Sequence, residues 1–546
     1  MPFLAQEHFP IPTKDITSWT FDDLASRYDW DDPIYIDGNN PSNSISARQA
    51  LSLTRKLVAG FRAIGAKRGD CVCINSFNDV QYPILFHGLV AGGLVFSGVN
   101  PAYTAYELAH TLKIAKVKYL LTQPDMLENV LKAAKEIGLP KENIIIFNPN
   151  GETAPAGFKQ WNDLLQHGEQ DWEHFDSLER CSNTTVARLF SSGTTGLPKA
   201  TDLSHYNLIA QHTLVFEADS RDWRVGRVLN LPMFHAATLP TAFTSSLRSG
   251  HRGVVFPRFE PESWFRAHEK FGITDLTVVP PMAILAINHP LKDVCSLKSV
   301  KVANCGAAPL DKHPQSRLQA LLGEGVPFTQ VWGMTETSCI ATRFPYPESD
   351  TTGSVGRPLP NLDMKLVDDS GKDITDYDVQ GEICIRGPTV VRGYFENPEA
   401  NKRDWDEDNY FHTGDIGYCD GKTKNWYIVD RKKELIKVRA FQVAPPELEG
   451  VLLSHPDIVD AAVIGVPDPT NAEGSESPRA YIVRRDVKSS QPSTQEVDAY
   501  MRERLAKFKM LTGGIVFVEA IPKNASGKIL KRLLREQAKK EMASKL

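Results

Sequence analysis

The chain has 546 residues, 41% of them apolar and 24% charged, which is typical of a folded globular protein and excludes a disordered or collagen-like chain. Its 62 Lys and Arg residues nearly balance its 67 Asp and Glu residues, so the net charge of −5 gives no indication of a nucleic-acid partner. Because the eight cysteines include no Cys-x-x-Cys pair, we expect reduced thiols rather than a zinc site or disulfides.

The first part of the chain gives no indication of a leader or a membrane span. Its start has no basic residues followed by an apolar run, which argues against a secretory signal. Residues 82–99 are nearly long enough to cross a bilayer, but they contain Pro83, His87 and four glycines. We therefore expect a buried helix, a turn at Gly92-Gly93 and a buried strand, and no transmembrane segment.

From about residue 45 to residue 430, short apolar runs alternate with helical patterns. A helix is expected over 207–218, because Ser204 is a good N-cap residue. The alternation predicts an α/β fold with several sheets covered by helices, and functional loops at the strand ends. Strands are expected at 186–190, 227–231, 253–256, 276–279, 300–304 and 328–331.

After about Asp430 the pattern changes to short strands and polar helices, which predicts a small, mobile α+β domain. Asp420-Gly421 predicts a hairpin turn between strands at 416–419 and 426–429. We place a large N-terminal domain at 1–432 and the small domain at 433–546. Within the small domain we expect strands at 461–465, 481–483 and 515–518, and helices at 446–453 and 494–508.

Residues 191–199, Ser-Ser-Gly-Thr-Thr-Gly-Leu-Pro-Lys, form the most informative segment. Two glycines permit a tight loop, and hydroxyl and backbone N–H groups can donate to phosphate oxygens. The loop follows a predicted strand, and Lys199 adds a cation. It is not a Walker P-loop, because Leu197 and Pro198 separate the second glycine from the lysine.

This segment resembles the signature loop of the adenylate-forming superfamily, which includes acyl-CoA synthetases and 4-coumarate:CoA ligases. The resemblance extends from about residue 20 to residue 540 and implies binding of ATP. Ala200 stands where a glycine usually follows the signature lysine. In the loop, the resemblance gives phosphate-binding roles to Ser191, Ser192, Gly193, Thr194, Thr195 and Lys199.

Residues 330–336, Gln-Val-Trp-Gly-Met-Thr-Glu, resemble the family's Gly-Tyr-Gly-Met-Thr-Glu segment. An aromatic ring beside a glycine suits a flat base that lies on the backbone, and Glu336 is a hard oxygen ligand of the kind that Mg²⁺ prefers. The resemblance assigns Gln330, Val331 and Trp332 to the nucleotide, Gly333 to the acid, and Thr335 and Glu336 to phosphate and Mg²⁺.

Gly414-Asp415 resembles the family's ribose clamp, and residues 522–528, Pro-Lys-Asn-Ala-Ser-Gly-Lys, resemble its catalytic-lysine loop. The segment 434–443 resembles the one that follows the hinge between the domains. The implied roles are ribose binding for Asp415 and Arg431, the hinge for Lys433, adenylation for Lys528, the thioester step for Lys437, and a nucleotide contact for Gln442.

The acid and CoA sites show departures from the family pattern. Arg439-Ala440 replaces the usual Lys-Gly, and Ala440 adds a Cβ where pantetheine should pass. Small residues follow the histidine of the acid pocket, where a tyrosine is common, so we expect a wider or longer pocket. The resemblance gives roles to His235, Ala236, Ala237, Gly306 and Ala307 at the acid, to Ala308 at the nucleotide, and to Arg258, Arg439 and Ala440 at CoA.

Together these features predict an ATP-dependent acid–CoA ligase that forms an acyl-adenylate and then a thioester. The alternatives are an adenylating enzyme with a different second step, such as luciferase-like oxidation or carrier loading, and a catalytically silent binding relative. The final Ser544-Lys545-Leu546 is a peroxisomal address, so we expect a peroxisomal protein that an import receptor recognises.

Overall fold

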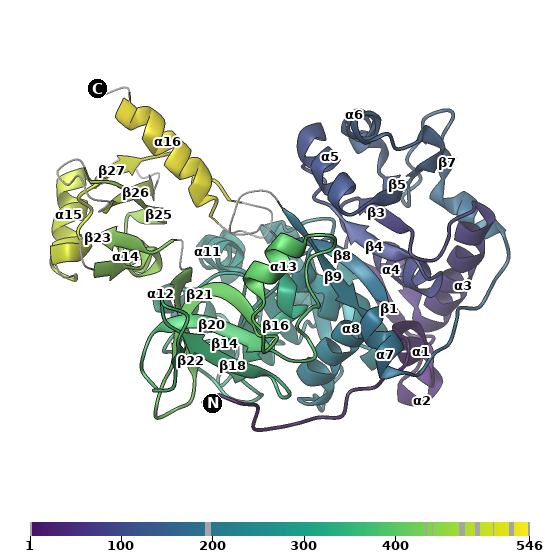
Figure 1. Cartoon of the computed structure of the whole chain (residues 1–546), viewed down its shortest axis with the longest axis horizontal. Helices are drawn as coiled ribbons and strands as arrows, with labels where there is room; N and C mark the ends of the chain where they lie inside the picture. Colours follow the sequence, from purple (N-terminus) through teal and green to yellow (C-terminus); the bar gives the residue numbers. More distant parts are fainter. Residues whose placement is uncertain are drawn as a thin grey trace.

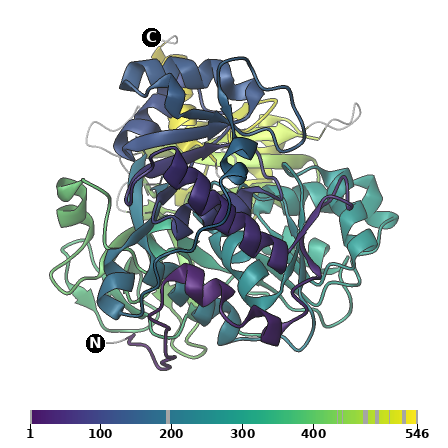
Figure 2. The ribbon, with the colours of Figure 1, turned by 90° about the vertical axis from the view of Figure 1, so that its right-hand side faces the viewer.

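The computed structural model describes residues 3–191, 198–431, 434–438, 441–468, 476–485, 492–505, 507–523 and 529–543. Figure 1 shows a large lobe that contains strands β1 to β22 and a small lobe that contains β23 to β27. In the perpendicular view of Figure 2 the N-terminal helices face the viewer and the small lobe lies behind them. The two-lobed α/β architecture predicted from the sequence is thus confirmed.

The N-terminal part of the large lobe contains a seven-stranded sheet in the order β7-β6-β5-β3-β4-β8-β9. Its neighbouring strands are parallel except for β8 and β9, which form an antiparallel hairpin. The strands are β3 (Cys71–Asn75), β4 (Val95–Gly98), β5 (Val117–Thr122), β6 (Ile144–Ile146), β7 (Lys159–Gln160), β8 (Thr185–Ser191) and β9 (Lys199–Ser204), and the helices beside them include α3 (Ala47–Ala63), α4 (Tyr82–Ala91), α5 (Ala105–Ile114) and α6 (Leu127–Ile137).

Two smaller sheets carry the middle of the chain, in the orders β10-β11-β1-β2 and β12-β13-β14. In the second sheet all strands are parallel, and Cys305 of β13 pairs with Gln330 of β14. The segments that follow these two residues therefore leave the same edge of the sheet. The strands are β1 (Pro33–Asp37), β2 (Ser44–Ser46), β10 (Gly226–Leu229), β11 (Arg252–Val255), β12 (Asp275–Val278), β13 (Val302–Cys305) and β14 (Phe328–Gln330).

The last part of the large lobe consists of two antiparallel sheets, β15-β16-β17 and β19-β18-β20-β21-β22. The N-terminal segment runs along the lower side of the lobe in Figure 1, and Phe3 forms a bridge to Met364 of β18. The strands are β15 (Trp332–Met334), β16 (Cys339–Arg343), β17 (Arg357–Pro358), β18 (Asp363–Val367), β19 (Asp373–Ile374), β20 (Gly381–Arg386), β21 (Phe411–Cys419) and β22 (Trp426–Arg431).

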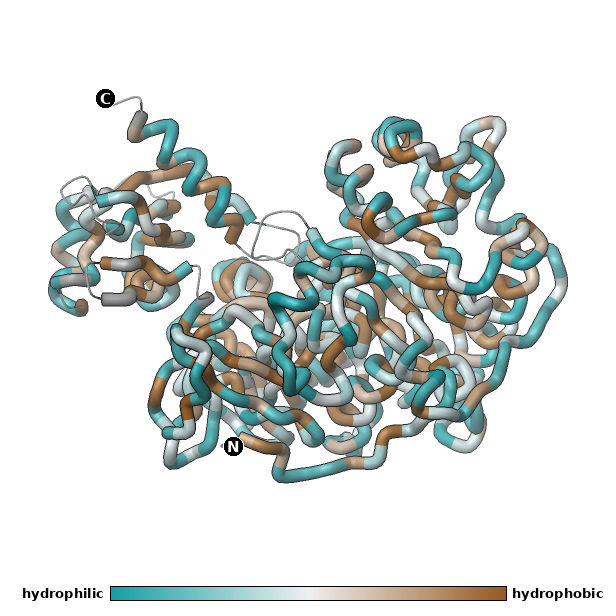
Figure 3. The backbone as a smooth tube through the Cα atoms, in the orientation of Figure 1, coloured by the Kyte–Doolittle hydropathy of each residue, from teal (hydrophilic) through white to brown (hydrophobic). Residues whose placement is uncertain are grey.

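The small lobe has a two-stranded and a three-stranded sheet, β23-β24 and β25-β26-β27. Apolar segments lie inside both lobes in Figure 3, whereas α16 is mostly hydrophilic. The elements are β23 (Ile436–Val438), β24 (Phe441–Val443), α14 (Pro445–Leu453), β25 (Ile458–Pro467), β26 (Glu476–Arg484), α15 (Thr494–Arg502), β27 (Gly514–Phe517) and α16 (Lys531–Ala543).

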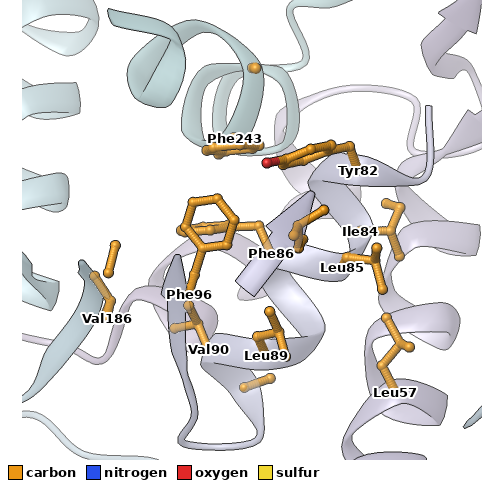
Figure 4. Close-up of a cluster of buried hydrophobic side chains, with 14 of the residues drawn as sticks. Leu57, Tyr82, Ile84, Leu85, Phe86, Leu89, Val90, Phe96, Val186 and Phe243 are labelled. Atoms are coloured by element: carbon orange, nitrogen blue, oxygen red, sulfur yellow. The ribbon is translucent and has the colours of Figure 1, made fainter. Parts of the chain in front are cut away.

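The core of the large lobe is rich in aromatic residues. Figure 4 shows Phe86 and Tyr82 of α4 beside Phe243, and the rings of Phe86 and Phe243 stack with centroids 4.5 Å apart. Gly88 allows α4 to approach α3 closely, since an added Cβ would lie 2.5 Å from the Leu57 side chain. This packing holds α4 against the sheet that contains β4, and the buried helix and strand expected within residues 82–99 are confirmed.

Some predicted boundaries are wrong. The helix after Ser204 begins as expected with a capping box, but its α-helical part (α8, His205–His212) ends early and continues as a π-helical turn over Thr213–Glu217. The helix predicted over 494–508 ends at Arg502, and the following turn brings Met510 into the same core as Met501. The strand expected at 300–304 is shifted to Val302–Cys305.

Candidate active site

A hydrogen bond joins two residues with predicted nucleotide roles. The indole Nε1–H of Trp332 donates to Oδ2 of Asp415 at 2.8 Å, and both side chains are buried. The Thr413 hydroxyl accepts a hydrogen bond from the Asp415 N–H at 3.1 Å. In the hairpin of β21 and β22, Asp415 pairs in register with Arg431. The structure thus brings together Trp332, Asp415 and the backbone of Arg431 from distant parts of the chain.

The backbone around Gly333 permits no side chain. A Cβ at this position would lie 1.7 Å from the carbonyl oxygen of Cys339. Ser338 and Cys339 have φ values of 60° and 135°, which bring β16 back against β15. Such left-handed conformations in residues other than glycine are strained and persist only where the surroundings impose them. The close strand pairing therefore fixes the shape of the segment that carries Trp332 and Gly333.

The segment after β13 lies beside the one after β14. An added Cβ at Gly306 would lie 2.9 Å from the Val331 side chain, and Ala307 has a left-handed φ of 69°. The Gln330 side chain binds both backbone groups of Leu310, with its amide nitrogen 2.8 Å from the carbonyl oxygen and its amide oxygen 2.9 Å from the N–H group. The side chain of Gln330 thus supports the loop that contains Ala308.

The antiparallel strands β8 and β9, here called the phosphate hairpin, flank the predicted phosphate loop. Ser191 at the end of β8 pairs in register with Lys199 at the start of β9. The predicted residues Ser192, Gly193, Thr194 and Thr195 lie outside the described residues. The Ser191 hydroxyl oxygen is buried, and it lies close enough to the Tyr394 hydroxyl to lower the pKa of that phenol.

Lys199 is buried, and its ammonium group contacts two side chains. Its Nζ lies 2.9 Å from Oδ2 of Asp404 and 3.7 Å from the ring centroid of Tyr394. Burial raises the pKa of Asp404, but hydrogen bonds from Arg403 and Lys199 outweigh burial and hold this pKa below its ordinary value. Asp404 is therefore ionised at neutral pH and anchors the start of β9, at the C-terminal end of the predicted phosphate loop.

Glu336 follows β15 in a short 3₁₀ turn (η8, Thr335–Thr337) and is buried beside Thr335. Its Oε1 accepts a hydrogen bond from the Tyr394 hydroxyl at 2.8 Å. Burial, followed by the Glu336 carboxylate, raises the pKa of Tyr394 above its ordinary value, so the phenol keeps its proton and donates. Among the described residues, no group of three His, Cys, Asp or Glu side chains could hold a metal ion.

The predicted acid pocket lies against β16. The Nδ1 atom of His235 accepts a hydrogen bond from the Ala237 N–H at 3.2 Å, and the Cys339 thiol lies 3.6 Å from the Ala237 carbonyl oxygen. Burial raises the pKa of Cys339 to about 12, so the thiol is protonated and is not a nucleophile. Ala236 is buried beside them.

Asn78 supports the loop that leads to His235. Its amide oxygen accepts from the Met233 N–H and its amide nitrogen donates to the Leu231 carbonyl, both at 2.9 Å. The close approach of Gly98 to Phe234 limits this loop further, since a Cβ on Gly98 would lie 2.7 Å from the Phe234 Cα. The loop is thus positioned from the carboxyl ends of β3 and β4.

Arg258 lies apart from these groups, on the surface. Its side chain is 70% exposed, and its Nε is 3.3 Å from Glu260. It borders a cavity of about 320 Å³ that Asn39 and Phe77 also line. The structure therefore does not bring Arg258 to the nucleotide residues, and its predicted role toward CoA stays a prediction.

The small lobe contains the remaining predicted residues. Lys437 of β23 pairs in register with Gln442 of β24. Lys433, Arg439, Ala440 and Lys528 lie outside the described residues, as do Ser544, Lys545 and Leu546. Their predicted roles therefore stay predictions.

Sequence reasoning missed four residues that hold the site together. Tyr394 and Asp404 lie beyond the signature segments, and Asn78 and Cys339 act through contacts that no local pattern shows. One weak signal in the sequence is Arg-Gly-Tyr-Phe at 392–395, and the glycine at 393 has a φ of 150° in the structure. Among the described residues, no helix is both long and apolar enough to cross a membrane.

Comparison with protein-family models gives two matches. The model described as "AMP-binding enzyme" matches residues 21–395, and the one described as "AMP-binding enzyme C-terminal domain" matches residues 447–528. The first match covers most of the large lobe and the second most of the small lobe.

Two curated fungal proteins are similar over almost their whole length. Phenylacetyl-CoA ligase epaB of Aspergillus niger is 51% identical over 542 residues, which cover 98% of this chain and 99% of that protein. Acyl-CoA ligase azaF of Aspergillus niger is 51% identical over 539 residues, which cover 98% of this chain and 100% of that protein.

Solved structures share the fold. ATP-bound MatB from Rhodopseudomonas palustris has a TM-score of 0.82 at 26% identity, covering 96% of this chain and 99% of that one. The anthranilate CoA ligase AuaEII in complex with anthranoyl-AMP has a TM-score of 0.84 at 22% identity, covering 98% of this chain and 99% of that one. The second likeness concerns the fold alone.

Proposed function

This chain belongs to the AMP-binding enzyme family and is an AMP-forming acid–CoA ligase, and we propose that it activates an aryl or medium-chain carboxylic acid. The observation that carries the nucleotide-binding part of this function is the 2.8 Å hydrogen bond between Trp332 and Asp415. It places a ring that can stack on a base next to a carboxylate that can accept from ribose hydroxyls.

In the proposed first step, an oxygen of the acid attacks the α-phosphorus of ATP and the bond to pyrophosphate breaks. Negative charge spreads over the phosphoryl oxygens, so donors and cations at fixed positions accelerate the step. We assign this role to the Ser191 and Thr335 hydroxyls and, from the small lobe, to Lys528. The place of Ser191, at the end of β8 directly before the predicted phosphate loop, supports its part in this assignment.

In the proposed second step, the thiol of CoA attacks the acyl carbon, AMP leaves, and the thiol proton is released. Lys528 would stand in the path of the thiol, so the small lobe must turn between the steps. A few residues at a junction can absorb such a rotation, and we assign this role to Lys433. The rotation would bring the β23 face with Lys437 toward the acyl group.

We propose that Mg²⁺ accompanies ATP and is held by Glu336. Mg²⁺ is usually bound by one or two carboxylates together with phosphate oxygens and water, which a single buried glutamate beside the phosphate hairpin fits. When bound, the ion would offset the negative charge of the phosphates.

The identity of the acid is the open part of the proposal. The small side chains of Ala236 and Ala237 after His235 support an acid longer or wider than a hydroxycinnamate. Because one relative is named a phenylacetyl-CoA ligase, phenylacetate is the first acid to test. Hydroxycinnamates and medium-chain aliphatic acids complete the set.

The experiment measures AMP and acyl-CoA formed from ATP, CoA and each acid of this set. We expect the two products in equal amounts with at least one acid. AMP without acyl-CoA would instead indicate a different second step, and no pyrophosphate release with any acid would indicate a silent relative.

We further propose a peroxisomal location, on the basis of Ser544-Lys545-Leu546. Removal of this tripeptide should leave the ligase rate unchanged and move a fluorescently tagged protein to the cytosol. Continued peroxisomal import of the shortened protein would refute the assignment.

A further inference from the structure

We propose that Tyr394 is a positioning residue that holds the phosphate hairpin and Glu336 at a fixed spacing during adenylation. The inference rests on the proposed function, because it concerns binding of ATP. Tyr394 is 4% exposed and contacts both parts: its hydroxyl donates to Glu336, and its ring lies under the ammonium of Lys199. One side chain thus joins segments from β9 and η8.

The position of Tyr394 is set by a loop of its own. Asn401 of α13 (Pro398–Asp404) accepts from the Tyr394 N–H at 2.7 Å and donates to its carbonyl oxygen at 3.0 Å. The ring of Trp405 meets the Tyr394 ring edge-on at 5.4 Å. These contacts do not involve Lys199 or Glu336. They therefore hold Tyr394 in place independently of the two residues that it positions.

The same loop is bound to the hairpin through its backbone. The Phe395 N–H donates to the Ala200 carbonyl at 2.8 Å, and the Asp202 N–H donates to the Gly393 carbonyl at 3.1 Å. Tyr394 therefore pairs with Thr201 near the start of β9, just after the predicted phosphate loop ends. A shift of this loop would move the hairpin with it.

The ring keeps two opposite charges in separate places. The Lys199 ammonium lies over the ring face and pairs with Asp404, whereas the Glu336 carboxylate lies at the hydroxyl edge. In a buried site an ammonium and a carboxylate attract each other strongly. Loss of the Tyr394 side chain would therefore remove one contact from each of these charged groups.

Two substitutions separate the parts played by the hydroxyl and the ring. Tyr394→Phe removes the hydrogen bond to Glu336 and keeps the ring under Lys199, whereas Tyr394→Leu removes both contacts. The matched control is Tyr35→Phe, since Tyr35 is also buried and donates to a backbone carbonyl, that of Ala242, at 2.7 Å.

The measurement is the Kd of ATP by calorimetry, with excess Mg²⁺ and with EDTA. Mg²⁺ should tighten ATP binding by the wild-type protein. In Tyr394→Phe the factor by which Mg²⁺ tightens ATP binding should be about tenfold smaller, as expected for one lost hydrogen bond to a charged group. The affinity of this variant for ATP in EDTA should be unchanged. Tyr394→Leu should also weaken binding in EDTA, because the hairpin loses its support.

Two results would overturn the inference. One is a Tyr394→Phe variant with the full Mg²⁺ gain, and the other is an equal loss of the gain in Tyr35→Phe, which would indicate a general effect on folding. Exchange of labelled pyrophosphate into ATP by the wild-type protein tests the proposed function separately. If the wild-type protein binds ATP but shows no exchange with any acid, the proposed function is wrong, irrespective of the results for the Tyr394 variants.

Discussion

The large lobe and the junction to the small lobe hold their polar side chains in different ways. In the large lobe, Asp415 and Glu336 are buried, and each accepts a hydrogen bond of 2.8 Å from an aromatic side chain. Beside the junction, within the small lobe, charged side chains pair at slightly longer distances. Arg535 of α16 lies 3.0 Å from Glu434, and Lys531 lies 3.2 Å from Glu449.

This difference suits an enzyme that performs two reactions at one site. Buried hydrogen bonds to charged groups are strong and directional, so the nucleotide residues stay in one geometry. The Arg535–Glu434 pair is partly exposed, and such a pair contributes about 0–1 kcal/mol and can exchange partners with water. The large lobe can therefore keep its geometry while the small lobe changes its orientation.

The largest effect on the reaction rate is expected for Lys528 of the small lobe. Lys528→Ala should slow adenylation by about 100-fold or more, because it removes the cation that we propose for the charge that develops in the transition state. The attack of CoA on a supplied acyl-adenylate should be largely retained, since we propose that this lysine acts in the first step only. Single-turnover assays of each half-reaction measure this, and an equal loss in both would contradict the division between the lobes.

The next effect should come from the large lobe. Trp332→Phe removes the N–H that orients Asp415 and should raise the KM for ATP about tenfold, as expected for a lost hydrogen bond to a carboxylate. Steady-state kinetics measure it, with Trp264→Phe as the control, since Trp264 is buried in a separate core of the large lobe. A similar KM change in both variants would show that loss of packing, rather than the hydrogen bond, is responsible.

The sequence predicted the architecture well where single segments determine it. The strand at β8, the helix after Ser204 and the hairpin of β21 and β22 each follow from local patterns. The early end of α15 could not be predicted, because it depends on Met510 reaching a core formed by distant elements. Tertiary packing overrides local helix preference in such cases.

For the site, the sequence identified the residues but not their connections. Trp332 and Asp415 were both predicted, yet their hydrogen bond depends on the pairing of two sheets. Lys199 was predicted as a cation for phosphate, and its contact with Asp404 could not be foreseen, because 205 residues separate them. Tyr394 was missed for the same reason.

A smaller effect is expected at the junction. Burial lowers the pKa of Lys531, but Glu449, Asp430 and Glu434 outweigh burial and raise it above its ordinary value, so the ammonium is charged. Asp430 belongs to β22 of the large lobe, so a rotation of the small lobe changes its distance from Lys531. Lys531→Gln should therefore change the two half-reaction rates in opposite directions, each by about two- to fivefold.

The control for this variant is Lys540→Gln, which removes an exposed charge from the same helix. Half-reaction rates at low and high salt give the measurement, because added salt weakens the wild-type interaction and should reduce the difference between the two proteins. If both rates fall together in Lys531→Gln, the lysine supports folding of the small lobe rather than its orientation.

The smallest effect should come from a charge cluster beside the Asp415 strand. Nδ1 of His412 lies 3.9 Å from Oε1 of Glu382, and its Nε2 lies 3.6 Å from Oδ2 of Asp406. The nearby Glu382 carboxylate raises the pKa of His412 above its ordinary value, against the opposing effect of burial. Glu382 also accepts from the Gly414 N–H at 3.1 Å, so this cluster is connected to the turn before Asp415.

Because the folded state binds this proton more tightly than the unfolded state, protonated His412 stabilises the fold below the unfolded pKa, and this contribution is lost as the pH rises through the folded pKa. His412→Gln should therefore reduce the free energy of unfolding at pH 5.5 by up to about 1 kcal/mol, with a smaller difference at pH 8.5. Urea unfolding at both values measures it, with exposed His167→Gln as the control. If the difference in unfolding free energy grew with pH, the folded state would bind neutral His412 better, and the positive charge of His412 would not stabilise the large lobe.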